Sequence, residues 1–164
     1  MTSKRRSFEA GHRRKFLVII DETPECDRAV YYAARRAQHT GGALVFLYVI
    51  ANDGFQHWLG VESIMRAEAE EEARKRIFHF IDRVREAAGI DPEMLIREGV
   101  RSDELVRLIE EDEDIAILVL AAGIGSEGPG PLVSNLAGKV SATFPIPITI
   151  VPGNLTDQEI DALA

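Results

Sequence analysis

The sequence predicts an α/β domain in which a five-stranded parallel sheet lies between two layers of helices. Apolar runs typical of strands alternate with helix-like segments along the chain, an order typical of strand–helix–strand units with right-handed crossovers. The run at 16–20 is continuous rather than alternating, which indicates a strand buried on both faces, as in parallel sheets. A chain of 164 residues, 46% of them apolar, is long enough for one such domain with a sizeable core.

The first half of the chain supplies two strands and two helices. Residues 16–20 read FLVII and predict the first strand, which ends at Asp21. Residues 22–42 predict a turn followed by a helix, and the run ALVFLYVI at 43–50 predicts the second strand. Apolar residues spaced three or four apart then predict a long amphipathic helix over residues 61–88.

The second half adds three strands and two helices. A short strand is expected at 93–97, and Ser102 is expected to cap the helix that follows. The remaining elements are a strand at 117–121, a helix at 131–143 and a last strand at 146–151.

Composition and charge indicate the bounds of the globular domain and the classes of partner to expect. We expect a flexible basic arm at residues 1–14, a globular domain at 15–152 and a polar tail at 153–164. The net charge is −8, and an acidic body argues against nucleic-acid binding. No apolar run approaches the length of a membrane span, no secretory signal is present, and Cys26 is the single cysteine, so we expect a cytoplasmic protein.

A glycine-rich loop separates the strand at 117–121 from the helix at 131–143. Such a loop before a helix can direct backbone N–H groups at phosphate, or it can be a tight connection only. Asp21 ends the first strand and would share one crevice with the loop if the first and fourth strands are neighbours. The alternative for Asp21 is a cap of the first helix. No Walker-type Gly-Lys-Ser/Thr motif is present.

Three segments resemble the universal stress protein family. They are FLVIIDETPECDRAV, VRSDELVRLIEEDEDIAILVLAAG and LVSNLAGKVSATFPIPITIVP, in which Pro145-x-Pro147 is the most specific item. The resemblance covers residues 15–152. It implies an adenine-nucleotide α-hydrolase-like sandwich with strand order 3-2-1-4-5.

Family members that bind ATP carry the motif Gly-x2-Gly-x9-Gly-Ser/Thr, from which this chain departs. Ala122 stands at the first glycine, Ser134 at the third, and the second spacer is one residue short. By resemblance Asp21 would accept hydrogen bonds from ribose hydroxyls, and Val49 would line the adenine pocket. The implied nucleotide site comprises Asp21, Val49, Ala122, Gly125, Ser134, Asn135 and Leu136.

The resemblance implies a stress-response module that binds ATP or a related nucleotide, with Mg²⁺ as a possible companion. The alternatives are a dimeric interaction module whose site has decayed and, third, a weak ATPase. We identify no catalytic residue and no set of metal ligands in the sequence. The segment from Pro145 to Val151 is expected to pair two copies into a homodimer, and His57 and Trp58 are expected near the mouth of the crevice, covering a ligand or packing at a contact.

Overall fold

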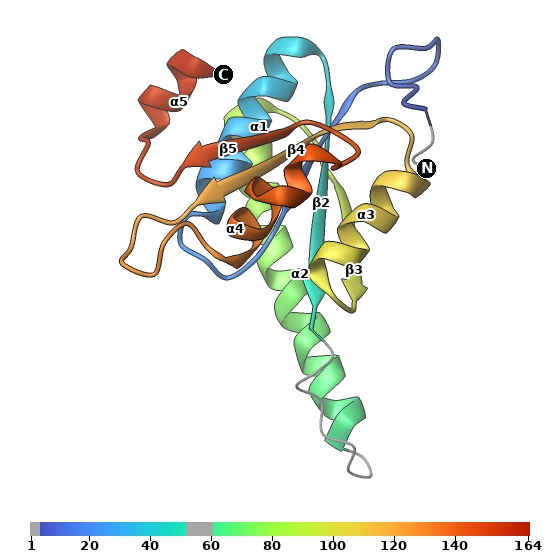
Figure 1. Ribbon diagram of the computed structural model, residues 1–164, viewed down its shortest axis with the longest axis vertical. Coiled ribbons are helices and arrows are strands. Elements are labelled where there is room, and N and C mark those ends of the chain that lie inside the picture. The colour runs from blue at the N-terminus through green and yellow to red at the C-terminus, as the bar shows by residue number, and fades with distance from the viewer. Residues whose placement is uncertain (1–3, 52–60) are drawn as a thin grey trace.

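The computed structural model describes residues 4–51 and 61–164 and contains one parallel sheet (Figure 1). Its strand order is β3-β2-β1-β4-β5, so the predicted order 3-2-1-4-5 is confirmed. The strands are β1 (Lys15–Ile19), β2 (Ala43–Ile50), β3 (Glu93–Glu98), β4 (Ile115–Ala122) and β5 (Ile148–Pro152). Their ends agree with the sequence-based expectations to within two residues.

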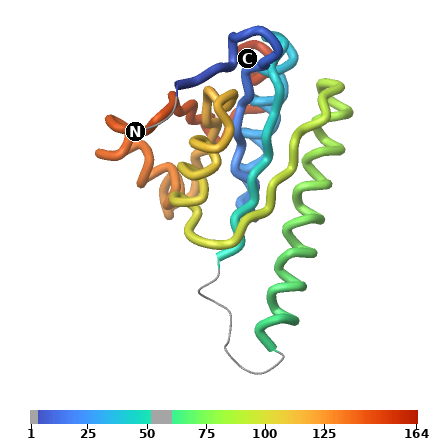
Figure 2. The backbone as a smooth tube through the Cα atoms, turned by 90° about the vertical axis from the view of Figure 1, so that its right-hand side faces the viewer, coloured from blue at the N-terminus to red at the C-terminus, as the bar shows by residue number. Residues whose placement is uncertain are grey.

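Helices cover both faces of the sheet and form a three-layer sandwich (Figure 2). One face carries α1 (Cys26–Thr40), α2 (Val61–Ala88) and α5 (Asp157–Leu163), and the other carries α3 (Arg101–Glu111) and α4 (Pro131–Ala137). Side chains of β1 alternate between the two cores: Phe16 and Val18 pack on one side, and Leu17 and Ile19 on the other. This two-sided burial explains why the central strands β1, β2 and β4 contain continuous apolar runs.

Two predicted helix boundaries differ from the structure. The helix expected at 131–143 is α4 followed by a 3-10 turn at Lys139–Ala142, because Gly138 adopts φ −81° and ψ −144°, outside the helical region. Ser102 does not cap α3, since this helix begins at Arg101 and Val100 occupies the cap position without a side-chain bond.

The end of the chain folds into α5, where the sequence predicted a polar tail at 153–164. Thr156 and Glu159 form a capping box: each side chain accepts a hydrogen bond from the backbone N–H of the other residue. Ile160 is fully buried in the core that α5 shares with α1. The ordered domain therefore extends beyond β5.

An ion network ties α5 to α1 and α2. Arg83 lies 3.1 Å from both Asp27 and Asp157, and Arg28 lies 2.7 Å from Asp157. Both guanidinium groups also lie over the ring of Tyr31. Burial alone would raise the pKa of Asp27, but hydrogen bonds and charges from Arg83 and Arg28 outweigh it and lower that pKa below its usual value.

The described part of the N-terminal segment, residues 4–14, lies against the C-terminal end of α3, whereas the sequence predicted a flexible arm at 1–14. The Arg5 guanidinium donates hydrogen bonds of 2.7 and 3.0 Å to two carbonyl oxygens at this helix end. His12 Nδ1 lies 2.7 Å from Asp114 Oδ1. The last carbonyls of a helix lack intrahelical partners and carry partial negative charge, which explains why cations bind there.

Among the helices of the described ranges, none has the length and apolarity that crossing a bilayer requires.

Candidate functional site

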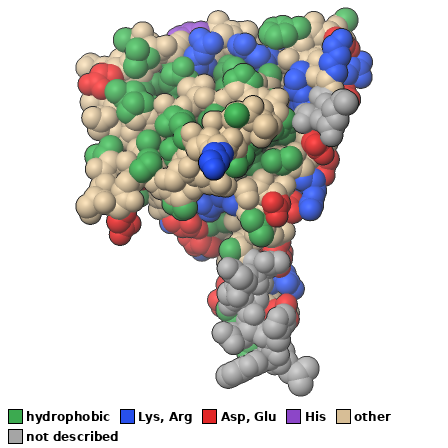
Figure 3. Space-filling view, in the orientation of Figure 1, with side chains coloured by type: hydrophobic (Ala, Val, Ile, Leu, Met, Phe, Trp, Pro, Cys, Tyr) green, Lys and Arg blue, Asp and Glu red, His purple; other side chains and the backbone are tan. Residues whose placement is uncertain are grey.

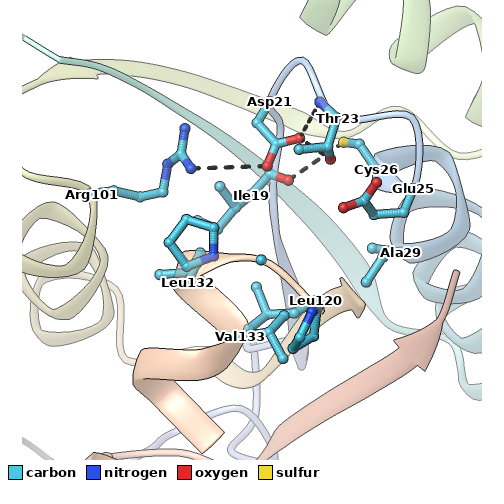
Figure 4. A pocket seen from close by; sticks show the side chains of 14 residues that line it. Ile19, Asp21, Thr23, Glu25, Cys26, Ala29, Arg101, Leu120, Leu132 and Val133 are labelled. Atoms are coloured by element: carbon cyan, nitrogen blue, oxygen red, sulfur yellow. Dashed lines mark hydrogen bonds and ion pairs between the residues drawn. The ribbon is translucent and has the colours of Figure 1, made fainter. Parts of the chain in front are cut away.

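A cavity of about 110 Å³ opens at the carboxyl edge of the sheet, between β1 and β4 (Figure 4). We call it the central cavity. Asp21 follows β1 on one side of it, Leu120 belongs to β4, and Pro131 and Leu132 begin α4. The strand order reverses at this position, because β1 pairs with β2 on one side and with β4 on the other. Parallel α/β sheets bind ligands at such positions.

Asp21 presents its carboxylate to the central cavity and is held by a tight local turn. Its Oδ1 accepts hydrogen bonds from the backbone N–H of Thr23 at 2.9 Å and from the Thr23 hydroxyl at 2.6 Å. α1 begins later, at Cys26, and Glu25 at its cap position makes no side-chain cap bond. Asp21 therefore does not cap this helix in the structure, and its Oδ2 points toward Arg101 (Figure 4).

Arg101 is the site residue that the sequence analysis missed. Its Nη1 lies 4.0 Å from Asp21 Oδ2, and its side chain is 34% exposed. It lines the central cavity, a hollow beside Val49 and another beside Asn135. The overlooked signal is its position as the first residue of α3, because a cation in the first turn of a helix opposes the helix dipole.

The glycine loop closes on itself beside a second hollow of about 490 Å³, which we call the loop hollow. The Gly123 N–H donates to the Pro129 carbonyl oxygen at 3.1 Å. The carboxylate of Glu25 packs against Gly123 so closely that a Cβ at this glycine would lie 2.8 Å from Oε1. Glu127 also lines the loop hollow, so the charged side chains described around it are acidic.

Acids outnumber cations around these cavities. Among the described residues that line the central cavity, the loop hollow and the hollows beside Val49 and Asn135, Arg101 is the only cation. The acids that line them are Asp21, Glu22, Glu25, Glu72 and Glu127. An anionic ligand would therefore meet favourable side-chain charge at one position.

The structure separates the residues that the sequence assigned to the site. Val49 is buried at the end of β2 and lines its hollow together with Tyr48 and Glu22, whose side chains form a hydrogen bond. Gly125 lines the loop hollow, and Asn135 lines a hollow with Arg101.

The other three assigned residues do not line these cavities in the structure. Ser134 is exposed one turn inside α4, and its N–H donates to the Gly130 carbonyl oxygen at 3.0 Å. Leu136 is buried in the core beneath α4. Ala122 ends β4 and pairs with Pro152. His57 and Trp58, expected near the mouth of the crevice, lie outside the described residues.

Cys26 borders the central cavity but is not a reactive thiol. It is buried, and its Sγ donates a weak hydrogen bond of 3.6 Å to the Ile19 carbonyl oxygen. Burial raises the pKa of this thiol to about 12, so the thiolate is scarce near neutral pH.

Comparison with known proteins gives both a family and related structures. The sequence profile of the universal stress protein family matches residues 12–152, and no curated protein matches the sequence significantly. The universal stress protein UspA from Lactobacillus plantarum superposes with a TM-score of 0.69 at 16% identity, over 84% of this chain and 97% of that chain.

Two further related structures contain a nucleotide. A universal stress protein in complex with cAMP aligns with a TM-score of 0.52 at 23% identity, over 86% of this chain and 98% of that chain. A universal stress protein family protein from Arabidopsis thaliana with AMP bound aligns with a TM-score of 0.55 at 15% identity, over 85% and 91% of the two chains. These similarities support the fold.

The family match and the fold agree. The matched region runs from the segment before β1 to the last residue of β5, and the sheet has the order expected of the adenine-nucleotide α-hydrolase-like sandwich. The chain therefore belongs to the universal stress protein family.

Proposed function

We propose that this protein binds an adenine nucleotide in the central cavity, with Asp21 accepting a hydrogen bond from a ribose hydroxyl. The observation that carries the proposal is the position of this carboxylate, which lines a cavity between the ends of β1 and β4. Related proteins of the same fold have been solved with cAMP and with AMP. The adenine would lie toward Val49, in the hollow at the end of β2.

The residues around the loop decide how well polyphosphates fit. Gly125 has open space where a Cβ would stand, which leaves room for a phosphate chain. Glu25 and Glu127 beside it would repel that chain unless a divalent cation lies between them. ATP therefore requires Mg²⁺ in this proposal, whereas a nucleoside monophosphate does not. Asn135 offers an amide beside Arg101, and the buried Leu136 is left without a direct role.

Thermal shift and calorimetry with AMP, and with ATP in the presence and absence of Mg²⁺, test the proposal. A ligand that binds only the native state must raise the melting temperature as its concentration exceeds Kd. Asp21→Asn keeps an oxygen for the Thr23 turn and removes the charge, so we expect about tenfold weaker AMP binding. Asp82→Asn is the matched control, because Asp82 is 80% exposed on α2.

A decayed site is the alternative that one observation favours. The Glu25 carboxylate packs against Gly123, and no cation lines the loop hollow among the described residues. If millimolar AMP and ATP–Mg²⁺ both leave the melting temperature unchanged, the protein acts as an interaction module without a nucleotide. Nucleotide hydrolysis over time would instead support the weak ATPase.

We also propose a homodimer through β5. This strand lies at the edge of the sheet, and Ile150 is 38% exposed on it. Figure 3 shows hydrophobic side chains spread over the face that carries β5 and α4, and the exposed Val140 follows α4. An edge strand with free backbone groups can pair antiparallel across a two-fold axis. Sedimentation should show a dimer for the native chain and a monomer for Ile150→Lys; a native monomer at micromolar concentration contradicts this proposal.

A further inference from the structure

The Asp21–Arg101 pair places a carboxylate and a guanidinium group side by side at the mouth of the central cavity. We propose that Arg101 binds a phosphate esterified to O2′ or O3′ of the ribose, so that the preferred ligand is a 2′-, 3′- or 3′,5′-cyclic adenine nucleotide. This inference rests on the proposed function, because it takes the ribose to be held by Asp21.

The first step is the division of labour between the two side chains. A carboxylate accepts hydrogen bonds and therefore selects a free ribose hydroxyl, whereas a guanidinium group donates and selects a phosphate. Dinucleotide-binding proteins use the same pair of choices, with an acid for the ribose 2′-hydroxyl or an arginine for the 2′-phosphate. Here both groups are present, with Arg101 Nη1 4.0 Å from Asp21 Oδ2.

The second step is the chemistry of the ribose edge. O2′ and O3′ are on adjacent carbons, so one can donate its hydrogen to Asp21 while a phosphate on the other faces Arg101. A 3′-phosphate and a 3′,5′-cyclic phosphate leave the 2′-hydroxyl free, and a 2′-phosphate leaves the 3′-hydroxyl free. Each of these ligands satisfies both side chains, whereas a 5′-nucleotide leaves Arg101 without its phosphate.

The third step is the charge around the 5′ side. If the ribose lies at Asp21, a 5′-phosphate extends toward the glycine loop, where Glu127 lines the loop hollow and Glu25 lines both this hollow and the central cavity. A phosphate at the ribose edge instead meets Arg101, the only cation among the described residues lining these cavities. At the ribose edge the Arg101 charge offsets that of Asp21, whereas among the described residues no cation offsets Glu25 and Glu127 at the loop hollow, so Coulomb interactions favour the ribose edge over the 5′ side.

The fourth step is the position of Arg101 in its own helix. It is the first residue of α3, where the helix dipole disfavours a cation and favours an anion. A phosphate bound to the guanidinium group would neutralise this unfavourable charge. The side chain is 34% exposed, so it can reach a ligand without leaving a buried position.

Calorimetric titration of the full chain with five ligands tests the inference. The ligands are adenosine, 5′-AMP, 2′-AMP, 3′-AMP and 3′,5′-cyclic AMP, all without divalent cations. For the native protein we expect the three ribose-edge phosphates to bind at least about tenfold more tightly than 5′-AMP. Arg101→Gln should remove this preference, because it weakens binding of the three ribose-edge phosphates at least about tenfold and binding of 5′-AMP much less.

Two further variants control for folding and for net charge. Arg101→Lys keeps the positive charge but loses the bidentate hydrogen bonding of the guanidinium group, so it should retain part of the preference for ribose-edge phosphates. Arg85→Gln makes the same chemical change at the exposed end of α2, where Arg85 pairs with Asp91, and should leave all five affinities unchanged. The melting temperatures of the variants show that each is folded.

The outcomes separate this inference from the proposed function. If 5′-AMP binds and the ribose-edge phosphates bind no better, Arg101 does not bind such a phosphate and only this inference is wrong. Equal weakening of every phosphorylated ligand by Arg101→Gln also overturns it, because the residue would then act as a general positive charge. If none of the five ligands binds the native protein, both proposals are wrong.

Discussion

Replacing Ile160 with alanine tests whether the C-terminal helix belongs to the folded domain. Ile160 is 0% exposed and lies in the core cluster that includes residues of α1. Loss of a buried isoleucine side chain down to alanine costs about 2–5 kcal/mol, since it removes apolar burial and leaves a cavity. A free tail would instead tolerate the change within about 0.5 kcal/mol.

The position of α5 narrows the expected loss of unfolding free energy in Ile160→Ala. The helix packs along α1, from Arg28 to His39, rather than over the centre of the sheet, so its surroundings can partly relax, and we expect about 3 kcal/mol. For a domain of this length that corresponds to a melting temperature lower by about 6–12 °C. Urea denaturation at pH 7 measures the free energy of unfolding, and calorimetry measures the temperature.

Leu163 provides the matched control on the same helix. Its side chain is 64% exposed, so Leu163→Ala should change the free energy of unfolding by less than about 0.5 kcal/mol. If Ile160→Ala and Leu163→Ala have the same small effect, α5 does not pack as described, and the reasoning about the C-terminal end of the domain is refuted.

Three further predictions concern the ion network around Asp27, the buried thiol of Cys26 and the backbone contact at Gly153. The pKa of Asp27 is lowered in the folded state, so the network stabilises the protein above about pH 4 and loses this contribution as pH falls. The free energy of unfolding measured in urea should therefore be higher for the native protein than for Asp27→Asn at pH 7. This difference should shrink toward pH 2. Cys26, with its raised pKa and buried position, should react with a thiol reagent at pH 8 far more slowly in native than in urea-unfolded protein. Gly153→Ala places a Cβ 2.3 Å from the Ala122 carbonyl oxygen and should cost more than about 1 kcal/mol by denaturation, whereas Gly125→Ala meets no atom within 4 Å and should be near neutral.

The sheet could be predicted because its signal is local and strong. β1, β2 and β4 contain continuous apolar runs, and the family resemblance supplied the order of the strands, which the structure confirms. α5 was missed because its single fully buried residue, Ile160, gives no periodic apolar stripe. The capping pair Thr156 and Glu159 was the available sign of a helix start there.

The candidate site was predictable only in part. Asp21 follows an apolar strand directly, so its place at the carboxyl edge of the sheet follows from the chain alone. Arg101 follows β3, which lies two strands away from β1, and its approach to Asp21 depends on how α3 crosses back over the sheet. Ser134 was assigned to the site by its place in the family motif, yet it lies exposed one turn inside α4 and does not line the central cavity or the loop hollow.

The length of α2 gives this helix two parts with different stability. Its first turns extend beyond the sheet in Figures 1 and 2, and the first buried residue along it is Ala73. Arg66 ties the projecting part to Glu98 at the end of β3 through a 2.9 Å ion pair. Amide protons before Ala73 should exchange with solvent by local fraying, whereas those after it require separation of the packed layers. The part of α2 from Ala73 onward is therefore held by packing against the domain, whereas the turns before it can fray without unfolding the rest.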